Sequence, residues 1–176
     1  MAGEEEPAAR AAALFGRFIS HYSAHIADES QPFPGVIGAL RTLKAAGAKL
    51  VVCTNKPTGL SNSLLAKLDM VELFDGVVGI DAVTAAKPSA AHLIEAVEAV
   101  GGDLARTVMV GDADTDAGAA RAAGTALILV DFGYTEIPAA ELSPDVLLHH
   151  FDGLVDACTN LLNGMRPVYL PCETMS

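Results

Sequence analysis

The chain has 176 residues and a formal net charge of −11, and 51% of its residues are hydrophobic while only 19% are charged. This balance excludes an intrinsically disordered protein, because disordered chains combine few hydrophobic residues with a high density of charge. The acidic charge, together with the lack of any run of lysines and arginines, argues against nucleic acids and anionic membranes as partners.

Neither a secretory signal nor a membrane span is indicated. Glu4, Glu5 and Glu6 give the first residues a charge opposite to that of a signal peptide. The longest apolar stretches are far shorter than the roughly 20 residues that cross a bilayer. The three cysteines, Cys53, Cys158 and Cys172, show no CxxC or zinc-like spacing. We therefore expect reduced thiols and a cytoplasmic protein.

The first predicted element is an amphipathic helix over residues 8–27. Hydrophobic side chains such as Leu14, Phe18 and Tyr22 recur there at a spacing of three to four residues. Pro32 and Pro34 end this pattern, since both prolines favour extended backbone before them. The sequence predicts a helical appendage over residues 1–31, joined by a hinge to the rest of the chain.

Helices and strands then alternate along the chain. Helices are predicted over residues 36–46, 60–68, 92–100 and 117–123, and strands over residues 49–53, 74–80, 107–110 and 126–130. The strands are continuous apolar runs, which is typical of strands covered on both faces. Gly47, Gly101 and Gly124 follow three of the helices, as is common where a helix ends. This order predicts an α/β fold with a mainly parallel sheet over residues 32–163, followed by a loose tail over residues 164–176.

Polar residues follow the predicted strands. They are Thr54 and Asn55 after the first strand, Asp81 after the second, Asp112, Asp114 and Asp116 after the third, and Asp131 after the fourth. Ligands of open parallel sheets bind beyond the carboxyl ends of the strands. We therefore expect these side chains to meet at one rim of the sheet.

The acidic run from Asp112 to Asp116 has two interpretations. Carboxylates suit Mg²⁺, which takes one or two of them together with water and phosphate oxygens. Alternatively, Asp114 or Thr115 caps the following helix. A calcium loop is disfavoured, because no glutamate stands at the twelfth position.

Thr54, Asn55 and Lys87 are candidates for binding an anion. Thr54 and Asn55 stand just before a helix whose free N–H groups favour negative charge, although an ordinary turn explains them equally well. Lys87 precedes Pro88 at the start of another helix, where it meets a phosphate or a carboxylate or simply lies on the surface. The five histidines show no ligand spacing, and we expect them at the surface or at interfaces. They are His21, His25, His92, His149 and His150.

Three segments in order resemble the second, third and fourth motifs of haloacid dehalogenase-type phosphatases. They are residues 51–56 (VVCTNK), 86–88 (AKP) and 110–116 (VGDADTD). Further details, among them residues 34–36 (PGV), 119–124 (AARAAG) and 133–134 (GY), are similar to phosphoglycolate phosphatases within that family. The resemblance covers about residues 18–154.

The resemblance implies a Rossmann-like three-layer core and a Mg²⁺-dependent phosphomonoester hydrolase that acts on a small phosphorylated metabolite. In such enzymes an aspartate forms an aspartyl-phosphate that water then hydrolyses. By position, Thr54 and Asn55 would hydrogen-bond the transferred phosphoryl group, and Lys87 would balance its charge. Asp112 would ligate Mg²⁺, and Asp116 would support either the metal shell or Lys87.

The sequence departs from the family in its first motif, an apolar strand ending in DxDGT that carries the nucleophile. No such segment is present, and neither Asp28 nor Glu29 follows a predicted strand. We expect an N-terminally truncated chain that begins inside the family's helical cap, so that residues 1–31 are a cap remnant, and that is inactive as given.

In the family the missing strand is the central one, between the strands that end at Thr54 and Gly111. We expect two strand edges to face an empty slot, with low stability, a rearranged sheet, a strand supplied from elsewhere or self-association through the edges. A non-catalytic relative that binds phosphate or a protein stays open as the alternative. An unrelated nucleotide-binding module is disfavoured, because GxGxxG after a strand and GxxxxGK[ST] are both absent.

Overall fold

The computed structural model describes residues 30–164. The predicted helix over residues 8–27, the cap remnant before Ser30 and the predicted tail after Gly164 lie outside the described residues. The division of the chain into these parts therefore stays a prediction.

The described chain alternates helices and strands as the sequence predicts. The helices are α2 (Val36–Ala45), α3 (Thr58–Lys67), α4 (Ala90–Ala99), α5 (Asp114–Ala123) and α6 (Leu154–Leu162). The strands are β1 (Val51–Thr54), β2 (Gly76–Gly79), β3 (Val108–Gly111), β4 (Ala126–Val130) and β5 (Val146–Leu148). Each predicted element from residue 36 to 130 is present, with shifts of a few residues at the ends. β5 and α6 are additional elements that were not predicted.

The helix ends follow the predicted glycine pattern. Gly124 closes α5 in the left-handed conformation with φ 73°, and Gly47 and Gly101 are left-handed after α2 and α4. Glycine adopts the left-handed backbone conformation without steric cost, because it has no Cβ. These glycines turn the chain sharply from each helix toward the next strand.

Among the residues that the structure describes, all strand pairs are parallel, and they form two separate sheets. β1 pairs with β2, with Val52 opposite Val77. β3, β4 and β5 form the second sheet in that order, with Met109 opposite Leu127. The parallel α/β fold is confirmed, and within residues 30–164 β1 and β3 are not paired with each other.

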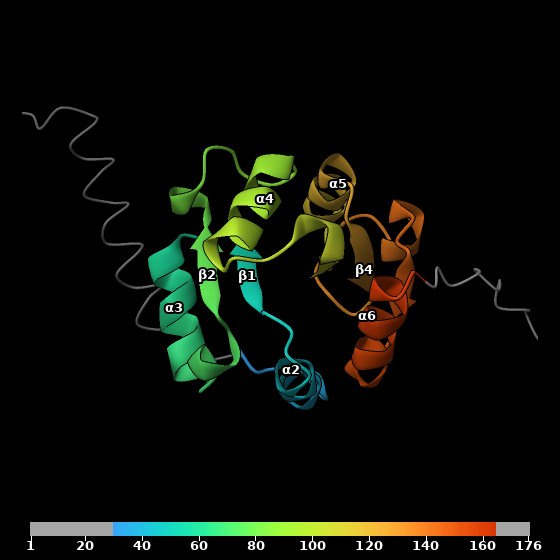
Figure 1. Cartoon of the computed structure of the whole chain (residues 1–176), viewed down its shortest axis with the longest axis horizontal. Coiled ribbons are helices and arrows are strands. Elements are labelled where there is room, and N and C mark those ends of the chain that lie inside the picture. Colours follow the sequence, from blue (N-terminus) through green and yellow to red (C-terminus); the bar gives the residue numbers. More distant parts are fainter. Residues whose placement is uncertain (1–29, 165–176) are drawn as a thin grey trace, which may run out of the picture.

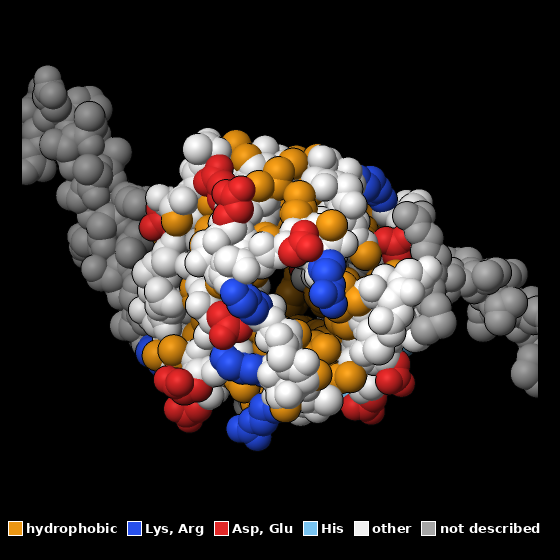
Figure 2. Space-filling view, viewed as in Figure 1, with side chains coloured by type: hydrophobic (Ala, Val, Ile, Leu, Met, Phe, Trp, Pro, Cys, Tyr) orange, Lys and Arg blue, Asp and Glu red, His pale blue; other side chains and the backbone are white. Residues whose placement is uncertain are grey.

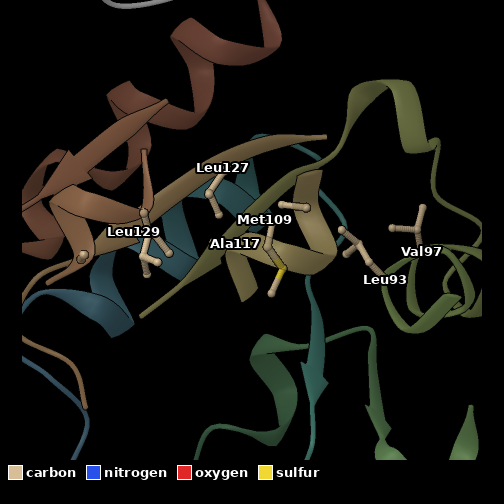
Figure 3. Close-up of a cluster of buried hydrophobic side chains, with 9 residues drawn as sticks. Leu93, Val97, Met109, Ala117, Leu127 and Leu129 are labelled. Carbon is tan, nitrogen blue, oxygen red and sulfur yellow. The ribbon is translucent and has the colours of Figure 1, made fainter. Parts of the chain in front are cut away.

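Helices cover both faces of the strands, which gives a three-layer arrangement. Figure 1 shows α4 and α5 along one side of the strands and α2 and α6 along the other. Ile128 and Leu129 are neighbours in β4, and both are 0% exposed. Because successive side chains of a strand point to opposite faces, the two belong to different clusters of buried hydrophobic residues. One cluster joins β3 and β4 to α4 and α5 through residues such as Leu93 and Met109 (Figure 3). The other joins β4 and β5 to α2 and α6.

Burial differs between the strands beside the gap and the strand inside the larger sheet. Every residue of β1 is only partly buried, whereas residues 127–130 of β4 are buried. A strand with one unpaired edge lacks neighbours on that side, so its side chains and backbone stay more accessible. Figure 2, in the same view as Figure 1, shows a hollow at the centre of the molecule with hydrophobic atoms inside it.

Candidate active site at the carboxyl ends of the strands

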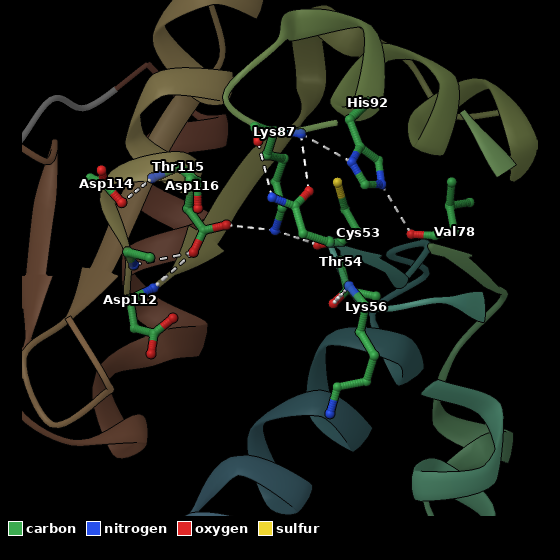
Figure 4. Close-up of polar contacts among 12 residues, drawn as sticks. Cys53, Thr54, Lys56, Val78, Lys87, His92, Asp112, Asp114, Thr115 and Asp116 are labelled. Carbon is green, nitrogen blue, oxygen red and sulfur yellow. Dashed lines mark hydrogen bonds and ion pairs between the residues drawn. The ribbon is translucent and has the colours of Figure 1, made fainter. Parts of the chain in front are cut away.

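Lys87 connects the two sheets at their carboxyl ends. Its Nζ donates to the carbonyl oxygen of Cys53 in β1 at 2.6 Å and to Oδ1 of Asp116 in α5, also at 2.6 Å (Figure 4). The side chains of Lys87 and Asp116 are only 9% and 7% exposed. A buried charge of either sign is stable only when it is paired, so each of these residues requires the other.

The backbone of Lys87 is held from two directions. Asn55 Oδ1 accepts from the Lys87 N–H at 3.1 Å, and Asn55 Nδ2 donates to the Lys87 carbonyl at 3.0 Å. His92 Nδ1 also faces the Lys87 N–H at 3.3 Å. Asn55, from the motif at β1, therefore contacts the main chain of Lys87, from the motif before α4. Two of the three predicted motifs are thus brought together.

His92 corrects the expectation that the histidines lie at the surface. It is 0% exposed, and its Nε2 lies 3.2 Å from the carbonyl oxygen of Val78. With Nε2 as the donor to Val78 and Nδ1 as the acceptor from Lys87, both ring nitrogens are satisfied. The spacing of polar side chains along the sequence cannot reveal this role, because both hydrogen-bond partners of His92 are main-chain groups. His149 and His150 are exposed as expected, and His21 and His25 lie outside the described residues.

Asp116 is the residue around which the loop after β3 folds. Its Oδ2 accepts from the N–H groups of Asp112 and Ala113 at 3.1 and 3.2 Å, while Oδ1 pairs with Lys87. The prediction that Asp114 or Thr115 caps this helix is wrong. The N-cap of α5 is Ala113, and the side chain that accepts from its N–H is Asp116. Gly111 makes room for it, because a Cβ there would come within 2.3 Å of Asp116 Oδ2.

Asp112 faces away from this ion pair. Its Oδ2 accepts from the N–H of Tyr134 at 2.8 Å, and a Cβ at Gly133 would lie only 2.2 Å from Asp112 Cβ. The loop after β4 thus approaches Asp112 as closely as a glycine allows. Figure 4 shows the Asp112 carboxylate directed away from the Lys87–Asp116 pair.

The start of α3 differs from the predicted anion cradle. Asp81 Oδ1 accepts from the Thr58 N–H at 2.7 Å and from Thr58 Oγ1 at 2.8 Å. These two hydrogen bonds lower the pKa of the Asp81 carboxyl below its usual value. The N–H at the helix start is therefore taken by a carboxylate of the chain itself. Thr54 Oγ1, at the end of β1, accepts from the Lys56 N–H at 3.1 Å.

Comparison with known proteins agrees with this arrangement. A sequence model of the haloacid dehalogenase-like hydrolases matches residues 2–124. The chain belongs to this family. It is 52% identical over 163 residues to phosphoglycolate phosphatase of Caulobacter vibrioides, covering 93% of this chain and 69% of the relative. It is 43% identical over 153 residues to phosphoglycolate phosphatase of Agrobacterium fabrum, covering 87% and 66%.

A solved structure supports the same assignment. The crystal structure of a predicted phosphoglycolate phosphatase from Haemophilus somnus superposes with a TM-score of 0.75 at 30% identity, over 80% of this chain and 63% of that one. This haloacid dehalogenase-like chain spans about two thirds of the length of the curated relatives it matches. The family resemblance and the fold expected from it are confirmed, and the chain is a phosphoglycolate phosphatase-like hydrolase of this family.

Of the rim carboxylates Asp112, Asp116 and Asp131, Asp112 is the one that keeps an oxygen for a metal. No group of three His, Cys, Asp or Glu side chains suited to a metal ion occurs within residues 30–164. Asp116 is occupied by Lys87 and two N–H groups, and Asp131 lies against His149. Asp112 is left with one oxygen beyond the bond from Tyr134. One carboxylate completed by water and phosphate oxygens fits the preference of Mg²⁺, so the donor set agrees in part.

Cys53 is partly buried beside Lys87, and burial raises the pKa of its thiol to about 11. The thiol is therefore protonated near neutral pH, which argues against a nucleophilic role for it. None of the helices between residues 30 and 164 has the length and hydrophobicity of a transmembrane segment.

Proposed function

We propose that this chain provides the charge-balancing and metal-binding part of a Mg²⁺-dependent phosphoglycolate phosphatase-like site. The observation that carries the proposal is the position of Lys87, whose ammonium is held between Cys53 and Asp116 at the carboxyl ends of two parallel sheets. An ammonium has three N–H donors, and two of those of Lys87 have acceptors in the described chain. The third is available to a phosphoryl oxygen.

The residues around Lys87 divide the remaining work. Asn55 orients Lys87 through its main chain, so it acts on the phosphoryl group through Lys87 rather than by the direct contact expected from the resemblance. Thr54 provides a hydroxyl at the end of β1 for a phosphoryl oxygen. The resemblance left two roles open for Asp116, support of the metal shell or of Lys87. Its ion pair with Lys87 favours the second role.

Asp112 is the residue that would hold Mg²⁺. When bound, the ion neutralises charge on the phosphoryl oxygens and orients them for displacement. The hydrogen bond from Tyr134 fixes one oxygen of Asp112 and thereby sets the direction in which the other faces. The substrate class that fits a fixed ammonium and a divalent cation is a small phosphate monoester, such as 2-phosphoglycolate.

We further propose that the chain by itself does not hydrolyse phosphate esters. The reaction expected of the family needs a carboxylate oxygen that attacks phosphorus while the ester oxygen leaves, followed by hydrolysis of the aspartyl-phosphate. In the described chain, the carboxylate that contacts Lys87 is Asp116, and its oxygens already accept from Lys87 and two N–H groups. Such a carboxylate is a poor nucleophile.

The test compares this chain with a version extended at its N-terminus by an apolar strand that ends in DxDGT. Mg²⁺-dependent phosphate release from 2-phosphoglycolate and p-nitrophenyl phosphate is measured for both. We expect release only from the extended version, and none when the first aspartate of its added motif is replaced by asparagine. Turnover by the original chain well above background would contradict the inactivity.

Absence of turnover in both versions would favour the second candidate, a non-catalytic relative that binds phosphate or a protein. Titration of the original chain with inorganic phosphate then distinguishes these two partners. Loss of phosphate binding in a Lys87→Met variant that stays folded would identify the rim as the phosphate site.

A further inference from the structure

Helix α4 holds the segment that precedes it in the chain. His92 and Glu95 stand three residues apart in α4, so their side chains lie on the same side of the helix. Glu95 Oε2 accepts from the Thr84 N–H at 3.1 Å, and His92 Nδ1 accepts from the Lys87 N–H at 3.3 Å. The helix therefore fixes the backbone at both ends of residues 84–87, the segment that leads to the lysine of the rim.

The two ring nitrogens of His92 have different tasks. Nδ1 faces the main-chain N–H of Lys87, and Nε2 lies 3.2 Å from the carbonyl oxygen of Val78 (Figure 4). A main-chain N–H can only donate and a carbonyl oxygen can only accept, so the ring must be neutral with its hydrogen on Nε2. Because the side chain is 0% exposed, water cannot replace either partner. His92 thereby ties the backbone of Lys87 to β2.

The position of the Lys87 backbone matters because its ammonium has little freedom. Nζ lies 2.6 Å from the carbonyl oxygen of Cys53 and 2.6 Å from Asp116 Oδ1, and the side chain is 9% exposed. A displaced backbone would pull the ammonium from these acceptors, and water at this depth could only partly replace them. The placement of the charge therefore depends on whatever holds the main chain of Lys87.

Asn55 and His92 share this task from different elements. Asn55 follows β1 and accepts from the Lys87 N–H at 3.1 Å, so this N–H is shared between Asn55 and His92. Asn55 belongs to a motif that the sequence already indicates, whereas His92 lies inside a helix and matches none of the three motifs. The second support of Lys87 is thus a residue to which neither the motifs nor the proposed function gives a role.

We propose that His92 is a positioning residue of the rim, and that its Nδ1 places the Lys87 ammonium between Cys53 and Asp116 by holding the Lys87 main chain. The contact of this ammonium with a phosphoryl oxygen rests on the proposed function, whereas its placement by His92 does not. The requirement is specific to one half of the ring. An acceptor at the place of Nδ1 positions Lys87, and a donor at the place of Nε2 serves stability alone.

Two amide side chains separate these halves. The oxygen of asparagine can take the place of Nδ1, and the amide nitrogen of the longer glutamine can take the place of Nε2. His92→Asn therefore keeps the acceptor for Lys87 and loses the donor to Val78, whereas His92→Gln does the opposite. Each variant loses one buried hydrogen bond, so we expect similar urea midpoints, both below that of the parent. Any general loosening of the chain then affects both variants alike.

Competitive acetylation of the full chain with limiting acetic anhydride, read by mass spectrometry after proteolysis, reports on Lys87. The more exposed Lys44 is the internal reference. A buried and ion-paired amine reacts slowly, so we expect Lys87 of the parent to react at least about tenfold more slowly than Lys44. Relative to Lys44, Lys87 should react about tenfold faster in His92→Gln than in the parent, and within about twofold of the parent in His92→Asn.

A second measurement needs no substitution. The ring nitrogens of His92 in a uniformly ¹⁵N-labelled chain, assigned by through-bond correlation, distinguish the two neutral tautomers by NMR. We expect hydrogen on Nε2 and a bare Nδ1 near neutral pH. Hydrogen on Nδ1 would overturn the proposal, because the ring could not then accept from Lys87. This result stays decisive even where one of the two variants fails to fold.

Unchanged reactivity of Lys87 in His92→Gln, or equal acceleration in both variants, would also overturn the positioning role. The two proposals fail separately. Phosphate ester hydrolysis by the N-terminally extended version, with Lys87 unaffected in His92→Gln, overturns the positioning role alone. The expected difference between the two variants, without hydrolysis by the extended version, overturns the proposed function alone.

Discussion

Lys87 and Asp116 form a buried ion pair with an Nζ–Oδ1 distance of 2.6 Å, and it spans the two halves of the fold. Lys87 follows the smaller sheet in the chain and Asp116 belongs to the helix after β3. Because neither side chain is accessible, the pair links the stability of the molecule to the geometry of its candidate site.

Replacing Lys87 by methionine is expected to lower the free energy of unfolding by about 3–5 kcal/mol, because it leaves the Asp116 carboxylate buried without its cation. Urea denaturation at neutral pH measures this change. The matched control is Lys44→Met, which breaks the exposed Lys44–Asp75 pair of 3.3 Å. We expect a loss of less than about 1 kcal/mol there. Equal losses in both variants would mean that the Lys87 pair is not shielded from water.

His92→Phe is expected to lower the free energy of unfolding by about 1–3 kcal/mol, since it leaves the buried Val78 carbonyl without its donor and the Lys87 N–H with Asn55 alone. The exposed His149, changed to phenylalanine in the same way, serves as the control and should change stability little. Thermal or urea unfolding compares the two. A stable His92→Phe variant would argue against hydrogen bonding as the reason for its burial.

Gly133→Ala should destabilise the chain and displace the loop that holds Asp112, because the added Cβ would meet Asp112 Cβ at 2.2 Å. We expect a loss of about 1–3 kcal/mol, as is usual for overpacking. Gly38→Ala is the opposite case, since it is exposed inside α2 and its Cβ would meet nothing within 4 Å. Its helix should gain about 0.5–1 kcal/mol. Melting temperatures that move in the same direction would contradict this pair of expectations.

Asp81 makes a contribution to stability that depends on pH. Hydrogen bonds from Thr58 lower its pKa in the folded state. Its contribution is therefore present above the ordinary pKa of 3.8, which holds in the unfolded chain, and is lost as the pH falls through the lower folded value. The melting temperature of an Asp81→Asn variant should therefore lie below that of the parent chain near pH 7. The difference should shrink as the pH falls below about 4 and disappear only below the lower folded pKa. A difference that stays constant from pH 7 to pH 3 would show that charge is not involved.

The sequence predicts local structure well where one element depends on its own residues. Apolar runs such as residues 126–130 indicate a buried strand, and β4 has these bounds, because covering both faces requires a hydrophobic residue at each position. β5 has no assignment, since its three residues are too few to show a pattern. The following α6 is amphipathic, but no helix is predicted over its residues.

The candidate site likewise contains residues that the sequence predicts and residues that it does not. Thr54, Asn55, Lys87, Asp112 and Asp116 can be selected from the sequence, because each stands directly after a strand or before a helix and matches a family motif. The buried His92 and the close approach of Gly133 to Asp112 cannot, because their partners are backbone atoms or residues distant in the chain.

By itself, then, the sequence determined the parallel α/β fold, the family and the residues that gather at the rim, since each depends on local patterns or on motif order. Only the tertiary structure decided how these residues are used. Lys87 lies between Cys53 and Asp116, Asn55 holds its backbone, and Asp81 takes the start of α3. The physical reason is that a charged or polar side chain takes the partners that packing brings to it, and packing joins residues from elements far apart in the chain.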